Sequence, residues 1–253
     1  MSVKDYFSGH AKGYAAFRPV YPDELYAFIL KHVNRTKKAW DCGTGNGQVA
    51  QRLAENFERV DATDISQNQI GQAPPVENIS YHVCPAEQTS FPNNHFDLVT
   101  VAQALHWFEL DKFYAEVKRV TVGGGVIAVW GYSLNTVNKN VDELTLDFYS
   151  NTVGPYWDPA RRMVENRYED LPFPFDPIPF PGFAITLLWT LRDYIGYLRT
   201  WSATQAYIRS NNTDPTDGLF HKLQAYWGPE EIKSVTFPLF GRMGRVADEP
   251  SRF

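Results

Sequence analysis

The sequence predicts an α/β fold, a doubly wound and mostly parallel sheet with helices on both faces. Strand-like and helix-like segments alternate through the first half of the chain, and this alternation requires crossover connections between parallel strands. Residues 96–102 are nearly all apolar, which is typical of a strand buried on both faces. A glycine-rich turn at residues 43–47 separates a short strand from an amphipathic helix.

The individual elements of this half follow from hydrophobic periodicity. The predicted strands are residues 38–41, 59–63, 79–83, 96–102 and 126–130. The predicted helices are residues 22–33, 48–57, 66–73 and 110–117. Ser66 is the predicted cap of the third helix, and Gly123-Gly124-Gly125 are predicted to turn the chain into the fifth strand.

After Trp130 the regular alternation ends. Residues 141–149, 193–209 and 216–226 are predicted helices, and residues 183–189 and 232–240 are predicted strands. Five prolines between Leu171 and Pro181 exclude regular structure there. That segment also carries Phe173 and Phe175, so we expect it to form a wall near His106 and Trp107 rather than a solvated linker. The alternative is a strap packed on the far side of the sheet that serves only stability.

These elements suggest three parts of the chain. Residues 1–132 form a ligand-binding core with an N-terminal cap segment, 1–34. Residues 133–182 form an insertion that acts as a lid over the substrate, and residues 183–253 complete the sheet and the pocket.

Composition excludes several classes of protein. Of the 253 residues, 43% are hydrophobic and 21% are charged, which excludes a largely disordered chain. A net charge of −5 argues against a general nucleic-acid binder. With two cysteines, Cys42 and Cys84, the chain has no disulfide framework and fits a reducing compartment. The start lacks an apolar signal region and the apolar runs are too short for a bilayer, so we expect a cytoplasmic protein without membrane partners.

The strongest motif is the run from Asp41 to Gly47, which is followed by Asp64 at the end of the next strand. Glycines at such a turn allow a ligand to approach the backbone, and an acid after the second strand can accept hydrogen bonds from ribose hydroxyls. Gln48 stands where a dinucleotide fingerprint has its third glycine, and the Asp41 carboxylate would repel phosphates. The motif therefore predicts an adenosine with a cationic amino-acid tail. In the alternative interpretation, the glycines only make a tight turn and Asp64 caps the next helix.

Four stretches, Trp40–Gln48, Asp64, Ala86-Glu87 and Phe96–Phe108, carry a resemblance to the class I S-adenosylmethionine-dependent methyltransferases with a methyltransferase type 11 core. The opening run from Tyr14 to Pro22 and the run from Ala102 to Phe108 resemble trans-aconitate methyltransferases and similar small-molecule enzymes. The resemblance implies a Rossmann-like sheet with a late antiparallel strand pair. It also implies methyl transfer from S-adenosylmethionine, with S-adenosylhomocysteine as product and without a metal.

The resemblance also implies cofactor contacts at ten positions. These are Asp41, Gly43 and Gly45 for the methionine part, Asp64 for the ribose hydroxyls, Ile65, Ala86 and Glu87 for adenine, Gln103 for the amino group through its backbone, and Tyr14 and Arg18 to close over the cofactor. For Arg18, a role as a surface cation before a proline stays open.

His106 and Trp107 follow the fourth strand, where the substrate pocket is expected. His106 is either a general base or a packed, hydrogen-bonded histidine. The strand does not end in the Asn/Asp-Pro-Pro-Tyr motif of base-methylating enzymes, and Ala102 and Gln103 replace the acids of a magnesium site. We therefore expect a small organic substrate. A carboxylate would suit the absence of a catalytic dyad, because it is ionised at neutral pH.

Two further points stay open at this level. Arg161, Arg162 and Arg167 either clamp an anionic substrate or form a solvated helix face. The alternative functions are a nicotinamide-dependent oxidoreductase, disfavoured by Gln48, and a catalytically silent binding protein, disfavoured by the intact glycines and Asp64. The methyl acceptor, the methylated atom and the oligomeric state are not indicated.

Overall fold

The computed structural model describes residues 19–228 and 231–247. These residues divide into two compact units. The first, the sheet unit, contains residues 21–131, 162–183 and 239–247; the second, the helical unit, contains residues 19–20, 132–161, 184–228 and 231–238. Residues 162–182, which we assigned to the insertion, thus group with the sheet unit. The lid function of residues 133–182 stays a prediction.

The strands follow the order of a doubly wound sheet. From one edge to the other they are β3 (Ile79–Val83), β2 (Arg59–Asp64), β1 (Lys38–Cys42), β4 (Phe96–Ala102), β5 (Thr121–Tyr132), β8 (Lys233–Arg245) and β6 (Asp176–Ile178), with β7 (Phe183–Trp189) also paired to β8. The pairs β2–β3, β1–β2, β1–β4 and β4–β5 are parallel, whereas β6 and β8 are antiparallel. The predicted fold class, mostly parallel with late antiparallel strands, is confirmed.

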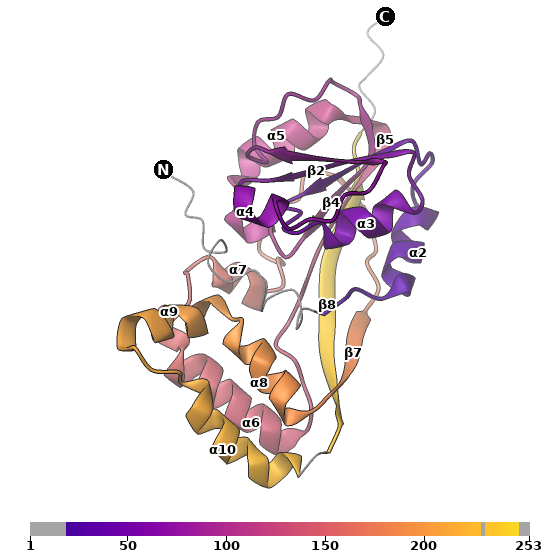
Figure 1. The fold of residues 1–253 in the computed structure, drawn as a ribbon. Helices are drawn as coiled ribbons and strands as arrows, with labels where there is room; N and C mark the ends of the chain where they lie inside the picture. Colours follow the sequence, from indigo (N-terminus) through magenta and orange to yellow (C-terminus); the bar gives the residue numbers. More distant parts are fainter. Residues whose placement is uncertain (1–18, 229–230, 248–253) are drawn as a thin grey trace, which may run out of the picture. The chain divides into compact units, whose positions relative to one another are not determined.

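Helices of the sheet unit cover both faces of its strands. They are α2 (Asp23–Lys31), α3 (Gln48–Ala54), α4 (Gln67–Ile70) and α5 (Leu110–Val120). In Figure 1, α3 and α4 lie on one face and α5 lies on the other. The central strands bury Trp40, Val99 and Ile127 completely, as expected for strands covered on both sides.

A buried acid joins the starts of β1 and β4. One oxygen of Asp97 accepts hydrogen bonds from the backbone amides of Lys37 and Lys38, each at 3.1 Å, and the other pairs with the Arg35 guanidinium at 2.9 Å. Strand order reverses between β1 and β4. The carboxyl ends of β1, β2, β3 and β4 therefore surround the position where ligands bind in this architecture.

The predicted turn at Gly123-Gly124-Gly125 is wrong, because these glycines lie within β5. Gly124 has a φ of +70°, and the register between β4 and β5 shifts between Phe96 and Leu98. A Cβ on Gly125 would lie 2.6 Å from the Thr121 side chain. The glycines thus form an irregularity inside a long strand, where φ > 0 and missing side chains are both needed.

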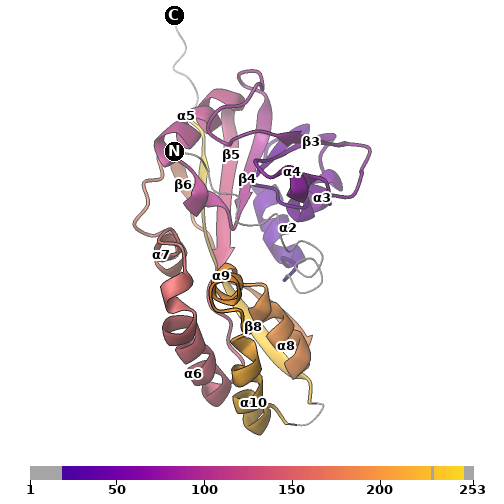
Figure 2. The ribbon, with the colours of Figure 1, turned by 60° about the vertical axis from the view of Figure 1, so that its left-hand side comes forward.

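The helical unit consists of several short helices. They are α6 (Lys139–Asp147), a π turn η2 (Phe148–Thr152), η3 (Gly154–Tyr156), α8 (Leu191–Arg199), α9 (Ser202–Asn211) and α10 (Thr216–Trp227), followed at the boundary of the units by α7 (Arg161–Glu165). Helices α6 and α8 both contact α10 (Figure 2). In their core the buried Tyr194 hydroxyl joins Asn135, at 2.9 Å, to Thr145, at 2.7 Å. In the part of the chain that the structure describes, no helix has the length and apolarity needed to cross a membrane.

The single helix that we predicted over residues 193–209 is two helices. The backbone of Trp201 is extended, with φ −61° and ψ 136°, and its side chain is buried. The ring packs on Tyr149, Trp157 and Tyr197. Packing of this indole in an aromatic cluster overrides the helical propensity of the surrounding sequence.

The Pro-rich segment contains a strand, contrary to the prediction. β6 pairs with β8 and includes Pro177 opposite Gly244, which is possible because β6 lies at the end of the strand order. The segment packs on glycines of β8: a Cβ on Gly244 would lie 2.8 Å from the Phe175 Cβ and 3.0 Å from the Phe173 ring. Phe175 also contacts Tyr114 of α5. These two phenylalanines thus pack in the core between α5 and β8, in the cluster that also contains Leu105 and Tyr168. The predicted wall near His106 stays a prediction.

Candidate functional site

The loop between β1 and α3 has a backbone that requires glycine. Gly43, Gly45 and Gly47 have φ values of +68°, +59° and +83°, which other residues rarely adopt. A Cβ on Gly43 would lie 2.6 Å from the Ala104 Cβ, and one on Gly47 would lie 2.6 Å from the Tyr81 hydroxyl. At Gly45 the nearest atom would be the Gln69 Oε1, at 3.9 Å. Two of the glycines are therefore packed against the protein, whereas no described residue closes the side of the loop at Gly45.

Asp64 joins this loop to the end of β2. Its Oδ2 accepts a hydrogen bond from the Gly45 amide at 2.9 Å, and its Oδ1 accepts one from the Ser66 amide at 2.8 Å. The side-chain cap of α4 is Ser66, as predicted, since its hydroxyl accepts from the Gln69 amide. The alternative interpretation of Asp64 as the cap of that helix is wrong. Its carboxylate instead lies between two loops at neighbouring strand ends.

Asp41 lies beneath the loop and is 1% exposed. It accepts hydrogen bonds from the Thr44 hydroxyl at 2.5 Å and from the Thr100 hydroxyl at 2.8 Å. Burial raises the pKa of this carboxyl to about 6, although those hydrogen bonds lower it. Asp41 thus holds the loop to β4, and its predicted contact with a methionine moiety stays a prediction.

Exposed apolar side chains lie beside Asp64. Ile65 is 42% exposed and Val83 is 46% exposed, and Val83 is the register partner of Asp64 on β3. Exposed apolar groups beside a carboxylate suit an aromatic ring attached to a hydroxylated sugar. Val83 was not among the predicted site residues. The sequence feature that could have indicated Val83 is its position as the last residue of an alternating strand that ends next to Asp64.

Ala86 and Glu87, predicted near adenine, have different environments. Ala86 is buried in the main core cluster. Glu87 is partly exposed, and its carboxylate accepts a hydrogen bond from the Glu109 amide at 2.8 Å, at the start of α5. Glu87 therefore fixes the loop before β4 to that helix.

The chain after β4 is strained where the substrate pocket was expected. Gln103 has a φ of +54°, its amide donates to the Trp130 carbonyl at 2.9 Å, and a Cβ on Gly131 would lie 2.9 Å from its Oε1. Non-glycine residues in this conformation are concentrated at functional sites. The short helix η1 (Leu105–Trp107) follows and carries His106.

His106 has a partner that the sequence did not indicate. Its Nδ1 lies 2.9 Å from the hydroxyl of Tyr168, which is fully buried and has a φ of +60°. Trp107 packs beside the imidazole, with ring centroids 4.7 Å apart. Because 62 positions separate the two partners, no local pattern could have predicted the pair.

The remaining predicted residues are dispersed. Tyr14 and Arg18 lie outside the described residues. Arg162 and Arg167 are exposed, in accord with the solvated-face interpretation, but Arg161 is partly buried and its guanidinium lies over the Trp157 ring.

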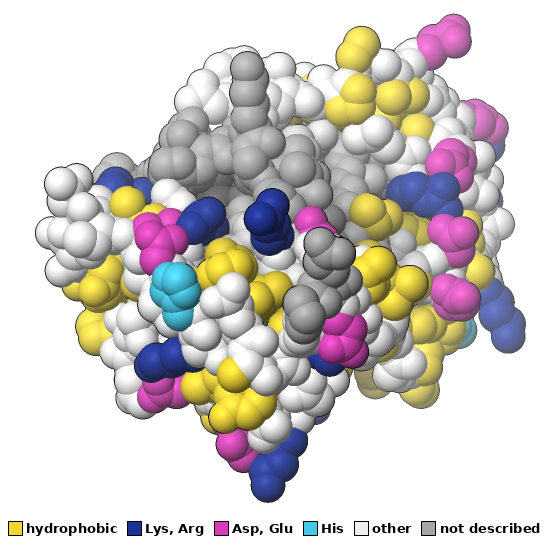
Figure 3. Space-filling model, turned by 60° about the horizontal axis from the view of Figure 1, so that its bottom comes forward, with side chains coloured by type: hydrophobic (Ala, Val, Ile, Leu, Met, Phe, Trp, Pro, Cys, Tyr) yellow, Lys and Arg dark blue, Asp and Glu magenta, His cyan; other side chains and the backbone are white. Residues whose placement is uncertain are grey.

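Within residues 19–228 and 231–247, no three His, Cys, Asp or Glu side chains come together to hold a metal ion. On the face drawn in Figure 3, basic and acidic side chains are intermixed.

Comparison with known proteins agrees with this geometry. The family model of a methyltransferase domain matches residues 40–129. A protein of Dictyostelium discoideum named as a methyltransferase is 34% identical over 244 residues, which cover 93% of each chain. The methyltransferase CfoB of Aspergillus candidus is 25% identical, over 95% of this chain and 78% of its own.

A solved structure from Anaeromyxobacter dehalogenans, described as a type II methyltransferase, has 40% sequence identity and a TM-score of 0.85, over 92% of this chain and all of that one. These relatives match nearly the whole chain and are named as methyltransferases, so the oxidoreductase alternative is not supported. The resemblance to trans-aconitate methyltransferases stays a prediction. The chain belongs to the class I S-adenosylmethionine-dependent methyltransferases.

Proposed function

We propose that the protein transfers a methyl group from S-adenosylmethionine to a small organic acceptor, and that the acceptor carries a carboxylate. The observation that carries the cofactor assignment is the side of the loop at Gly45 that no described residue closes, next to Asp64 and the exposed Ile65. A Cβ on Gly45 would project into this space without displacing an atom of the described residues. The residues present therefore fit an adenosine with an amino-acid tail.

The proposed binding roles follow from these positions. Asp64 accepts hydrogen bonds from ribose hydroxyls, and Ile65 and Val83 cover the adenine. Asp41 holds the Gly43–Gly47 loop in its left-handed conformation through Thr44 and Thr100. When bound, S-adenosylmethionine supplies a methyl group on a positively charged sulfur, already activated for transfer. The protein contributes orientation, which is worth roughly 7–11 kcal/mol in well-aligned reactions.

His106 is the proposed acceptor-side residue. Tyr168 fixes the imidazole orientation through Nδ1, so that Nε2 can accept a proton from an acceptor or orient it. A carboxylate acceptor is ionised at neutral pH and needs no base; for such an acceptor His106 orients only. A net charge of −5 and the absence of a base-methylation motif favour a small molecule over nucleic acid. The free thiols of Cys42 and Cys84 favour a reducing compartment such as the cytoplasm.

The test has two steps. S-adenosylhomocysteine should raise the melting temperature of the purified protein by mass action, whereas NADH should not. The protein should then transfer labelled methyl groups from S-adenosylmethionine to members of a panel of small organic acids, and Asp64→Ala should abolish most of this transfer. Stabilisation by NADH alone would overturn the cofactor assignment. Binding of S-adenosylhomocysteine without transfer to any acid or neutral acceptor would favour the catalytically silent alternative.

A further inference from the structure

Arg161 is partly buried among aromatic side chains of the helical unit. Its Nε donates a hydrogen bond to the Tyr149 hydroxyl at 3.1 Å. Its guanidinium carbon lies 5.0 Å from the centroid of the Trp157 ring and 5.8 Å from that of Tyr149. These contacts hold the guanidinium in one orientation, since stacking on aromatic faces and one hydrogen bond both restrict it.

The aromatic residues around Arg161 form one continuous cluster. Trp157 packs against Tyr149 at 4.9 Å and against Trp201 at 5.6 Å between ring centroids. The Trp157 indole also donates to the Tyr149 carbonyl at 3.2 Å. Trp201 in turn contacts the buried Tyr197. The environment of the arginine is thus rigid and mostly apolar.

Arg161 has no acidic partner among residues 19–228 and 231–247, although burial of a cation normally requires one. Arg199, in the same unit, pairs with Asp214 and Asp217 at 2.5 and 2.9 Å. Arg161 donates to Tyr149 through Nε, and its terminal nitrogens make no hydrogen bond to another described residue. Those nitrogens therefore keep their donors for a ligand.

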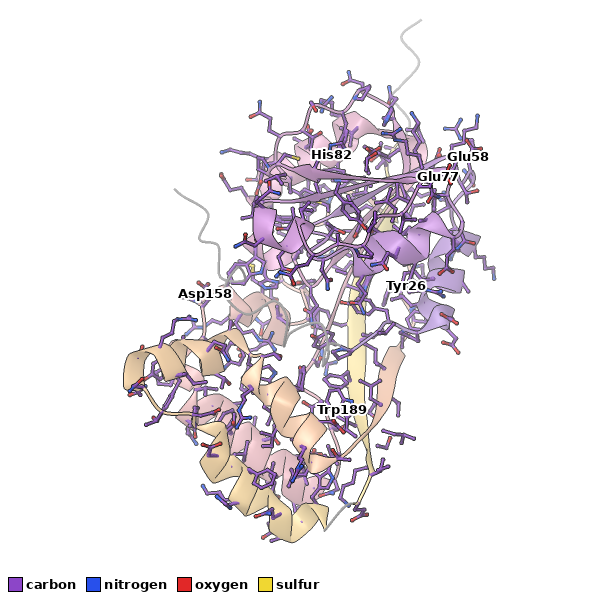
Figure 4. All side chains as sticks on the ribbon, in the orientation of Figure 1. Tyr26, Glu58, Glu77, His82, Asp158 and Trp189 are labelled. Atoms are coloured by element: carbon purple, nitrogen blue, oxygen red, sulfur yellow. The ribbon has the colours of Figure 1, made fainter. Side chains whose placement is uncertain are left out.

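Asp158 lies three positions before Arg161 in the chain, on the segment that leads to α7 (Figure 4). Its carboxylate accepts a hydrogen bond from the Ala160 amide at 2.9 Å, and no ion pair joins it to Arg161 among the described residues. The nearest acid in sequence thus stabilises the turn before α7 and leaves the guanidinium uncompensated.

We propose that Arg161, Tyr149, Trp157 and Trp201 form a binding site for a small carboxylate with an apolar or aromatic body. A guanidinium matches a carboxylate through two parallel hydrogen bonds, and the aromatic rings match an apolar body. One cation balances a monoanion. A phosphate dianion would need a second cation, which this cluster lacks among the described residues.

The test uses phenylacetate as the probe, with phenylacetamide as its neutral isostere, and measures binding by ligand-observed NMR. Phenylacetate should bind the wild-type protein at least tenfold more tightly than phenylacetamide. Arg161→Gln should weaken phenylacetate binding at least tenfold, and Arg161→Lys should weaken it less. Arg162→Gln, which changes an exposed neighbour, is the matched control and should leave binding unchanged.

Melting temperatures and S-adenosylhomocysteine affinities of all variants separate this proposal from the proposed function. Both should stay near the wild-type values in Arg161→Gln. Equal binding of phenylacetate by the wild type and Arg161→Gln would overturn the proposal, as would tighter binding of inorganic phosphate than of phenylacetate. Failure of S-adenosylhomocysteine to bind the wild type would overturn the methyltransferase function, whatever the outcome with phenylacetate.

Discussion

Buried and partly buried charged side chains have different kinds of partner in the sheet unit and in the helical unit. In the sheet unit, each buried or partly buried acid near the strand ends is bonded to the chain itself: Asp41 to Thr44 and Thr100, and Asp64 to Gly45 and Ser66. In the helical unit, Arg161 lies among aromatic rings, and no acid of the described residues pairs with it. Asp41 and Asp64 therefore both maintain the shape of a loop, and Asp64 is in addition proposed to bind ribose, whereas the proposed role of Arg161 is to bind a carboxylate. The comparison predicts that substitutions of these acids and of the core of the sheet unit mainly affect stability or cofactor affinity.

The largest expected effect comes from the Pro-rich segment of the sheet unit. Phe175 is 8% exposed and packs on Tyr114 and Phe173. Phe175→Ala should lower the free energy of unfolding by roughly 3–5 kcal/mol, measured by urea denaturation. Leu188→Ala, at a side chain that is 74% exposed on β7, is the control and should change it by less than about 0.5 kcal/mol. A normal unfolding free energy together with weaker acceptor binding would instead make the segment a lid.

The second effect is a pH dependence caused by Asp41. Its pKa is about 6 in the folded protein, against an ordinary value of 3.8. The folded state therefore keeps a proton that the unfolded state releases, and stability should fall as the pH rises from about 4 through 6, by roughly 3 kcal/mol. Asp41→Asn should remove this part of the pH dependence in urea denaturation, while Asp111→Asn, at an exposed acid of α5, should not. Parallel profiles for the wild type and Asp41→Asn would mean that the carboxyl is ionised throughout this range.

The sequence predicted those features that depend on local patterns. The bounds of β4 and β7 agree with the predicted residues, 96–102 and 183–189, because each is a short apolar run between turn residues. Asp64, Ile65 and Gln103 do lie at carboxyl ends of strands, since a βα alternation determines which residues end each strand. Predicting these positions does not require knowing which residues pack against them.

Features that depend on distant contacts were not predictable in this way. The Gly124 irregularity depends on the neighbouring β4, and the break before α9 depends on the packing of Trp201. The partnership of His106 with Tyr168 joins two segments far apart in sequence. Arg161 and Arg162 are adjacent in sequence, and only the fold distinguishes the partly buried residue from the exposed one.

A third prediction concerns the cofactor loop. Charge-assisted hydrogen bonds are worth roughly 1.5–3 kcal/mol each, so Asp64→Ala should weaken S-adenosylhomocysteine binding at least tenfold in calorimetric titration, with the fold intact. Glu77→Ala, at an exposed acid labelled in Figure 4, should leave the affinity unchanged. If the Asp64→Ala variant has a lower melting temperature but binds S-adenosylhomocysteine normally, the Asp64 carboxylate only stabilises the turn in which it lies. It then does not bind the cofactor.

The smallest expected effect concerns His106. It distinguishes a structural role, like that of the acids that hold the loop of the sheet unit, from contact with a ligand. The Tyr168 hydroxyl lies 2.9 Å from Nδ1 of His106, and a hydrogen bond of this kind contributes about 0.5–1.5 kcal/mol. If the pair orients the imidazole for the acceptor, Tyr168→Phe should lower turnover about threefold to tenfold with little change in S-adenosylhomocysteine affinity. His106→Asn should lower turnover further, and combining the two substitutions should add little to it, because the hydroxyl acts through the imidazole.

Phe220→Leu, in the helical unit and outside both proposed sites, is the control. Loss of stability in Tyr168→Phe without loss of turnover per folded molecule would place His106 among the structural residues, and the acceptor side of the reaction would then rest on residues other than this pair.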